Sequence, residues 1–236
     1  MNLLVFLAKK IRFHNQSFSS TVVKIGTVSV AIGISTLIIA LAVLFGFKNT
    51  IKDKLFSLNG HIQVSKITLN HSFDEIPFKR NSTIEEIVSR IPTFKAFYPI
   101  INKAGILKSA TEINGVLIKG VDSSFSNSPF KKSLVEGRWI SHKNQNEIII
   151  SRKIAKKLSI SLNESILIYF VQNPPRARKF NVVGIYDTGI VEYDNSLVYT
   201  NSAILQKLNN WENSEIGHYE LFIQNFEQLS NSIEHL

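Results

Sequence analysis

The feature that most constrains this chain is an unbroken run of twenty-three uncharged residues, Ile25 to Phe47. A helix rises about 1.5 Å per residue, so a run of this length can cross a hydrocarbon core of roughly 30 Å. A lysine borders the run on each side. We therefore expect residues 25–47 to form a transmembrane helix, residues 1–24 to form an amphipathic segment, and residues 48–236 to form one extramembrane domain.

A cleaved secretory signal is the alternative interpretation of this run, because Ala40-Leu41-Ala42 fits a small-residue cleavage site. The segment before the run is already 24 residues long, however, and the run continues to Phe47, past the point of cleavage. An uncleaved anchor is therefore favoured. Cleavage near Ala42 would instead leave a secreted binding protein.

Small residues inside the run follow one another at spacings of three and four, so they share one face of a helix. In lipid, small residues let helices approach closely, because packing drives their association. Glycine is common in membrane helices in any case, so chance placement is the alternative. We expect a helix-packing face for a partner helix, made of Gly26, Ser29, Gly33, Thr36 and Ala40.

The segment before the run is basic and amphipathic. Residues 2–13 place apolar side chains at helical spacing, with Lys9, Lys10 and Arg12 between them. This pattern is typical of a helix that lies in the membrane surface, and a frayed tail is the alternative. Charge does not orient the span, because four basic residues lie within about twenty residues of each end.

The charge distribution and the cysteine content of the chain exclude several classes of function. The chain carries 27 Lys and Arg against 18 Asp and Glu, a net charge of +9, but the bases are spread out and not interleaved with aromatic residues. Nucleic-acid binding is therefore not expected. The absence of cysteine excludes disulfides, thiolate catalysis and cysteine-ligated zinc.

The first half of the extramembrane region reads as a β-α-β unit followed by a hairpin. Alternation of apolar and polar residues predicts a strand over 60–67. Ser82 and Glu85 fit a capping box, which predicts a helix that starts there and stops before Pro92. Two further strands are expected, at 94–110 and 115–121.

The second half is expected to contain shorter elements. Residues 122–146 are rich in Ser, Asn and Gly and are expected to be loop, and a turn over 172–178 is expected to join two strands. The expected strands are 147–150, 166–170, 180–186, 196–200 and 219–223, with helices that begin at Ser151, Ser202 and Phe226. The fold class is therefore α+β.

The sequence lacks the common motifs of catalytic, phosphate-binding and zinc-binding sites. It contains no phosphate-binding loop, no nucleophile elbow and no histidine pair at zinc-ligand spacing. Asp187 and Asp194 are interpreted as turn residues, and Glu85 with Glu86 as capping and solvated helix residues. We therefore expect no enzyme, no cofactor and no catalytic or metal site.

Three groups of residues, taken with the amino-terminal run, are similar to one known family. They are Glu136-Gly137-Arg138-Trp139 with Asn146-Glu147-Ile148-Ile149-Ile150-Ser151, the helix from Lys153 to Leu158, and Phe180 to Gly189 with Glu192-Tyr193-Asp194. In this order and spacing, the chain resembles the Lol-type lipoprotein-releasing permeases of the MacB/FtsX-like ABC transporter superfamily.

The resemblance implies a permease subunit in a bacterial inner membrane, with a cytoplasmic amino-terminal segment. The single span would be followed by a periplasmic β-α-β (porter-like) domain with an inserted mostly-β subdomain, the MacB-like periplasmic core. The implied partners are a separate ABC ATPase, a second permease copy or paralogue, a lipoprotein and a periplasmic lipoprotein chaperone. ATP-driven closure would be transmitted to the periplasmic domain, with no chemistry in the permease itself.

Other members of the superfamily, and other classes of membrane protein, also combine an amino-terminal span with a periplasmic domain. An FtsX-like or exporter-like permease belongs to the same superfamily. A single-span sensor or scaffold with a periplasmic binding domain would also combine one anchor with one ectodomain. Family members have four spans, and this sequence contains one, so we expect an incomplete permease with an unpaired sheet edge.

The turn between the strands at 166–170 and 180–186 occupies the position of the family's chaperone-binding hairpin but is short. Prolines stiffen it, and its arginines suit carboxylates or lipid phosphates, so we expect a partner contact there. A plain solvated hairpin is the alternative. The expected contact residues are Gln172, Asn173, Pro174, Pro175, Arg176 and Arg178.

Overall fold

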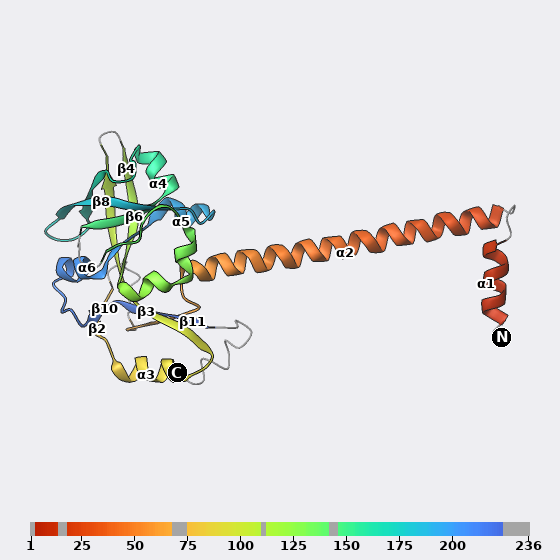
Figure 1. Ribbon diagram of the computed structural model, residues 1–236, viewed down its shortest axis with the longest axis horizontal. Coiled ribbons are helices and arrows are strands. Elements are labelled where there is room, and N and C mark those ends of the chain that lie inside the picture. The colour runs from red at the N-terminus through yellow and green to blue at the C-terminus, as the bar shows by residue number, and fades with distance from the viewer. Residues whose placement is uncertain (1–2, 14–17, 68–74, 110–111, 142–145, 224–236) are drawn as a thin grey trace. The chain divides into compact units, whose positions relative to one another are not determined.

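The computed structural model describes residues 3–13, 18–67, 75–109, 112–141 and 146–223. The chain divides into two units, residues 1–53 and 54–236. The first unit holds helix α1 (Leu3–Phe13) and most of helix α2 (Phe18–Leu58), which are drawn in red and orange in Figure 1. The expected amino-terminal helix is thus confirmed as α1, and the apolar run lies within the longer helix α2.

Six strands of the second unit pair in a closed ring, in the order β3-β4-β9-β6-β8-β7 and back to β3. Pairs β4–β9 and β6–β8 are parallel, and the other pairs are antiparallel. We call this the strand ring. Its strands are β3 (Phe94–Lys108), β4 (Ile113–Val121), β6 (Glu147–Ser151), β7 (Ser165–Phe170), β8 (Arg176–Tyr186) and β9 (Leu197–Asn201).

The inside of the strand ring is filled by aliphatic and aromatic side chains at alternate positions, such as Ile166, Ile168 and Phe170 of β7. Side chains of helices α4 (Arg152–Leu158) and α6 (Ser202–Asn209) join the same core. As expected, Ser151 caps α4: its hydroxyl accepts a hydrogen bond from the Ile154 N–H at 3.0 Å.

A β-α-β unit extends the sheet beyond the ring. Strands β1 (Ile62–Ser65) and β3 both lie antiparallel to β11 (His218–Ile223), so they run parallel to each other with β11 between them. Helix α3 (Ser82–Arg90) connects them and lies at the same end of the domain as β11 in Figure 1. A second, two-stranded sheet joins β2 (Phe78–Lys79) to β10 (Glu215–Ile216). The expected α+β class and β-α-β unit are confirmed.

The expectation of a loop over 122–146 is wrong for its first half. The chain there forms two 3-10 helices, Ser123–Asn127 and Pro129–Ser133, and strand β5 (Leu134–Gly137), which pairs with β8. Phe125 and Phe130 from the 3-10 helices are fully buried, and Phe130 stacks on Tyr199 at 4.2 Å between ring centroids. Such short 3-10 helices show no helical periodicity in the sequence, so the sequence pattern does not predict them.

Two further local expectations are wrong. Helix α3 is capped by Asn81, whose side chain accepts from the Thr83 N–H at 2.9 Å, and not by a capping box. Strand β8 begins at Arg176, because Phe170 pairs with Arg176, and the turn is therefore shorter than expected. The expected helix from Phe226 lies outside the described residues.

Candidate functional site

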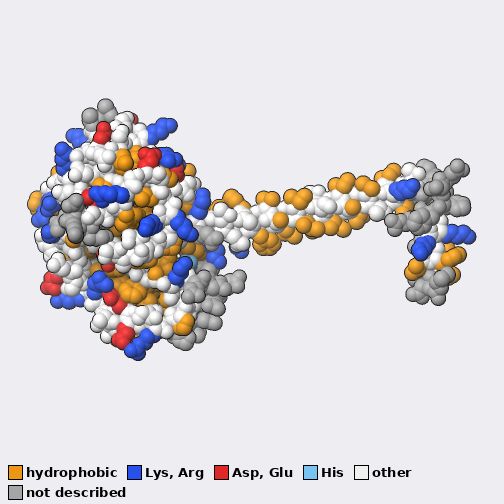
Figure 2. Space-filling model, viewed as in Figure 1, with side chains coloured by type: hydrophobic (Ala, Val, Ile, Leu, Met, Phe, Trp, Pro, Cys, Tyr) orange, Lys and Arg blue, Asp and Glu red, His pale blue; other side chains and the backbone are white. Residues whose placement is uncertain are grey.

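The apolar part of α2 is long and uncovered. Residues Thr21–Phe56 form a helix long and apolar enough, by length and composition, to cross a membrane. Figure 2 shows hydrophobic side chains along its visible face, with no acidic or basic side chain in its middle part. The hydroxyls of Thr27, Thr36 and Thr50 each donate to the carbonyl four residues earlier, at 2.8 to 2.9 Å. Such internal pairing is what a lipid environment requires.

The expected small-residue face lies on this helix. A Cβ atom added at Gly26 or at Gly33 would meet no described atom within 4 Å. The part of the chain that the structure describes therefore leaves room for a close neighbour at both glycines. The partner helix itself stays a prediction.

A buried lysine holds the carboxyl end of α2. Lys119 of β4 is 2% exposed, and its ammonium donates to the Leu58 carbonyl at 3.0 Å and to Asn59 Oδ1 at 3.3 Å. The last carbonyls of a helix lack intrahelical partners and form the negative end of its dipole, so a cation is favoured there. Glu220 of β11 pairs with Lys119 at 2.7 Å between Nζ and Oε1. We call Leu58, Asn59, Lys119 and Glu220 the α2 clamp.

Aromatic side chains enclose the α2 clamp. Asn59 donates to the Tyr193 hydroxyl at 2.8 Å, and the Lys119 ammonium lies 5.5 Å from the ring centre of Phe125. Burial raises the pKa of Glu220, but the charge of Lys119 and hydrogen bonds from His218 and Lys119 outweigh it, so the pKa is lowered overall. Glu220 is therefore ionised at neutral pH and forms a true ion pair with Lys119.

The charges continue from the α2 clamp along one line. His218 of β11 lies 3.6 Å from Glu220 through Nε2 and 2.7 Å from Glu75 through Nδ1. Burial lowers the pKa of His218, yet hydrogen bonds and charges of the two carboxylates raise it overall. Glu75 also accepts from the Asn102 N–H at 2.7 Å. Four buried or half-buried groups thus link the end of α2 to the segment before β2.

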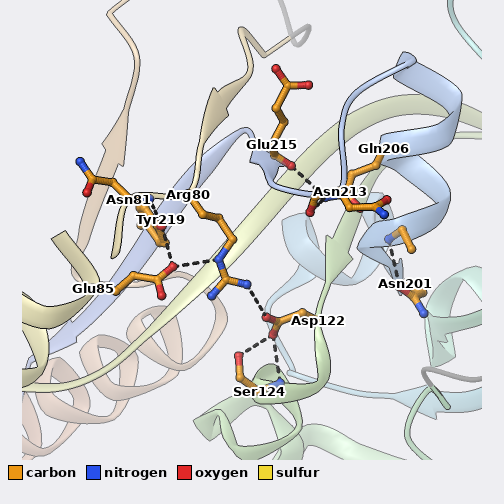
Figure 3. A network of polar contacts seen from close by, with 11 residues as sticks. Arg80, Asn81, Glu85, Asp122, Ser124, Asn201, Gln206, Asn213, Glu215 and Tyr219 are labelled. Carbon is orange, nitrogen blue, oxygen red and sulfur yellow. Dashed lines mark hydrogen bonds and ion pairs between the residues drawn. The ribbon is translucent and has the colours of Figure 1, made fainter. Parts of the chain in front are cut away.

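A second polar network joins α3 to the rest of the domain (Figure 3). Arg80 lies between two carboxylates, with Nε 2.8 Å from Glu85 of α3 and Nη1 3.7 Å from Asp122 at the end of β4. The Tyr219 hydroxyl donates to Glu85 at 2.8 Å and accepts from the Asn81 N–H at 3.2 Å. Glu85 is therefore an interelement contact, and its expected capping role is wrong.

The residues on which the family resemblance rests hold separate stretches of the domain together. Arg138 makes a bidentate pair with Glu147, at 2.6 and 3.0 Å, and so joins the two stretches of the first group. Gly137, at φ 78°, pairs with Gly184 of β8, and a Cβ on Gly137 would lie 2.3 Å from the Val183 carbonyl oxygen. Their spacing in the sequence reflects this packing.

The two aspartates of the third group stabilise the turn at Thr188 and Gly189, but the expected loop is wrong in part, because Asp194 lies in a helix. Asp194 is buried in helix α5 (Val191–Ser196). Its carboxylate accepts hydrogen bonds from the Thr188 N–H at 3.2 Å, from the Thr188 hydroxyl at 2.7 Å and from the Gly189 N–H at 3.1 Å. Asp187 accepts from the Gly189 N–H at 3.1 Å. Among the described residues, no group of three or more potential metal ligands comes together.

The expected partner-contact residues lie at the β7–β8 turn, but they do not share one environment. Pro174, Pro175 and Arg178 are exposed. Arg176 is half-buried, and its guanidinium donates to the Leu208 carbonyl at the end of α6 at 3.2 Å. Gln172 and Asn173 border a cleft instead of pointing only to solvent.

Sequence patterns did not reveal the α2 clamp. Its only trace in the sequence is a lysine within the apolar strand Ile113–Val121, and a lone lysine there has no distinctive spacing. Its partners, Leu58 and Glu220, lie 61 and 101 positions away in the sequence. The α2 clamp is thus a contact between the last residues of α2, at Leu58 and Asn59, and strands β4 and β11.

The chain matches the family model described as the MacB-like periplasmic core domain over residues 27–224, and it belongs to that family. It is 25% identical over 185 residues to the lipoprotein-releasing system transmembrane protein LolC of Buchnera aphidicola, covering 73% of this chain and 43% of that protein. It is 23% identical to LolC of Neisseria meningitidis over 200 residues, 78% of this chain and 45% of that protein.

Among solved structures, the periplasmic region of MacB from Actinobacillus actinomycetemcomitans is similar with a TM-score of 0.47 and 14% identity, covering 75% of this chain and 83% of that one. The resemblance to Lol-type permeases is confirmed by the family match and these relatives. The chain spans less than half the length of the curated relatives that it matches.

Proposed function

We propose that this chain supplies the first span and the periplasmic domain of an ABC transporter permease that releases lipoproteins from the inner membrane. The observation that carries the proposal is the family match over residues 27–224, together with similarity to LolC proteins along most of the chain. The proposal assigns ATP hydrolysis to a separate ATPase and gives the chain itself no catalytic residue.

The α2 clamp supports a mechanical role for the domain. A buried ion pair that also holds a helix-terminal carbonyl resists displacement, because separating its members would leave charges buried without partners. A movement of α2 would therefore be passed to β4 and β11, which carry Lys119 and Glu220. In this proposal the amino terminus is cytoplasmic, and the small-residue face packs on a second permease copy or paralogue.

We further propose that the exposed part of the β7–β8 turn contacts the chaperone or the lipoprotein. Of its arginines, Arg178 is exposed, whereas Arg176 is engaged by α6, so Arg178 is the residue available to a partner. An FtsX-like or exporter-like permease would use the same anchor and clamp with a different cargo.

The experiment uses the full-length permease, purified with its co-purifying ATPase and placed in proteoliposomes with a fluorescent triacylated lipoprotein. We expect ATP-dependent release of the lipoprotein into a soluble chaperone fraction, and no release with a non-hydrolysable ATP analogue. Failure of any ATPase to co-purify would contradict the permease assignment. ATPase activity without lipoprotein release would instead favour the FtsX-like or exporter-like alternative.

A further inference from the structure

A polar cleft of about 310 Å³ opens beside the β7–β8 turn. That size is at the lower end of the volumes of ligand-binding pockets. The walls come from the segment before β2, the middle of β3, the turn and the end of α6. Glu75, the last member of the charged line that starts at the α2 clamp, lies in one wall.

The cleft lies where the sheet divides. Strand β3 pairs with β11 as far as Ile100 and with β7 from Gly105 onward. Between these pairings, the Asn102 N–H is held by the Glu75 carboxylate, and a side chain therefore takes the position that a neighbouring strand would occupy. A polypeptide entering the cleft would approach this division in the sheet.

The chemistry of the walls favours a ligand that both donates and accepts hydrogen bonds. Seven of the nine lining residues have polar side chains, and five of these are Asn or Gln. A side-chain amide offers one carbonyl and one NH₂ group, which complement the N–H and C=O of a peptide group. Gln172 borders the cleft, and its Oε1, although buried, has no hydrogen-bond partner among the described residues, so the acceptor capacity of this amide is unused.

The charges of the cleft nearly balance. Lys103 is 6% exposed, and its ammonium donates to Asn209 Oδ1 at 2.6 Å, while Glu75 supplies one carboxylate. A ligand with a large net charge is therefore disfavoured. Trp211 packs against the core of the strand ring, and this engagement makes it a poor platform for stacking a sugar ring.

We propose that this cleft binds a short, neutral, extended segment of polypeptide through its backbone. The site recognises peptide groups and not particular side chains, because apolar pockets are nearly lacking among its lining residues. The inference goes beyond the proposed function, since it holds for any cargo that the permease handles.

The test uses the full chain in detergent micelles, labelled with 5-fluorotryptophan. The chain has two tryptophans: Trp211 borders the cleft, and Trp139 packs on Phe125 and Phe130 elsewhere, so Trp139 is an internal control. The probe is acetyl-trialanine-amide, and maltotriose is the comparison. We expect the peptide to shift the Trp211 fluorine resonance saturably and to leave the Trp139 resonance unchanged.

The variant Gln172→Leu should weaken this peptide about fivefold, the effect of one lost hydrogen bond. Gln63→Leu, on the exposed face of β1, is the matched control and should bind like the wild type. If Gln172→Leu does not fold, Asn173→Ala at the exposed edge of the cleft takes its place, with loss of affinity again expected.

The proposal is overturned if the peptide leaves Trp211 unchanged, if only maltotriose shifts it, or if folded cleft variants bind as tightly as the wild type. None of these outcomes bears on ATP-driven lipoprotein release, so the two proposals fail separately.

Discussion

Two regions of this chain use the same residue type in opposite ways. Ile34 and Ile38 of α2 are 54% and 60% exposed, whereas Ile148 and Ile168 of the strand ring are fully buried. Burial of apolar surface stabilises by about 25 cal/mol per Å², so the ring is stabilised by its own residues, while the helix has to bury its surface in something else. Hydrophobicity alone therefore does not place a segment in a protein core. Whether a segment is buried depends on the elements that pack against it.

The largest loss of stability is expected from removing a buried charge inside the domain. Lys119→Met should lower the free energy of unfolding of the domain by about 3–5 kcal/mol, because it leaves Glu220 buried without its partner. Urea unfolding followed by tryptophan fluorescence would measure it. The double variant Lys119→Met/Glu220→Leu should recover much of this loss, since neither member of the Lys119–Glu220 pair is left buried without the other. A single variant as stable as the wild type would show that the ion pair is dispensable.

A matched pair of substitutions tests the comparison itself. Ile168→Ala removes packing inside the strand ring and should cost about 3 kcal/mol in the free energy of unfolding of the domain. Ile34→Ala on α2 should change it by less than about 0.5 kcal/mol, because that side chain is 54% exposed. The same urea titration measures both. Equal losses would contradict the difference between the two regions.

His218 should make the stability depend on pH. The pKa of its folded form is raised, so its contribution is fully present below its ordinary pKa of 6.5 and is lost as the pH rises through the raised value. Glu220 acts in the opposite direction: its lowered pKa protects the domain above 4.5, and this protection is lost at lower pH. Replacing His218 with Gln should flatten the decline above pH 6.5 in thermal unfolding. An unchanged dependence of thermal stability on pH would show that His218 does not cause the decline.

The smallest effect concerns the uncovered face of α2. Gly33→Leu should weaken association with the second permease subunit by about 1 kcal/mol, close to fivefold in affinity, because a large side chain keeps helices apart. Gly46→Leu is the control, since this glycine is equally uncovered but lies off the small-residue face. Quantitative co-purification measures the difference. Equal retention of the partner in both variants would argue against the predicted packing face.

The sequence was most informative where periodicity is strong. The apolar run, the helix capped by Ser151 and the long strands β3 and β4 follow from local pattern and were predicted. Strand β5 and the start of β8 were missed, because their residues are short or polar and are held by neighbours distant in sequence. The α2 clamp could not be predicted for the same reason, since Lys119 acquires its role only when β11 and the end of α2 are brought beside it.

The most direct test of the account uses the double variant Lys119→Met/Glu220→Leu in the full-length permease with its ATPase. The measurement is the amount of lipoprotein released per ATP hydrolysed in proteoliposomes, after tryptophan fluorescence has shown that the domain is folded. We predict near wild-type ATP hydrolysis with much less lipoprotein released per ATP, because the end of α2 loses the ion-paired contact with β4 and β11. A folded double variant that releases as much lipoprotein per ATP as the wild type would contradict the role of the α2 clamp.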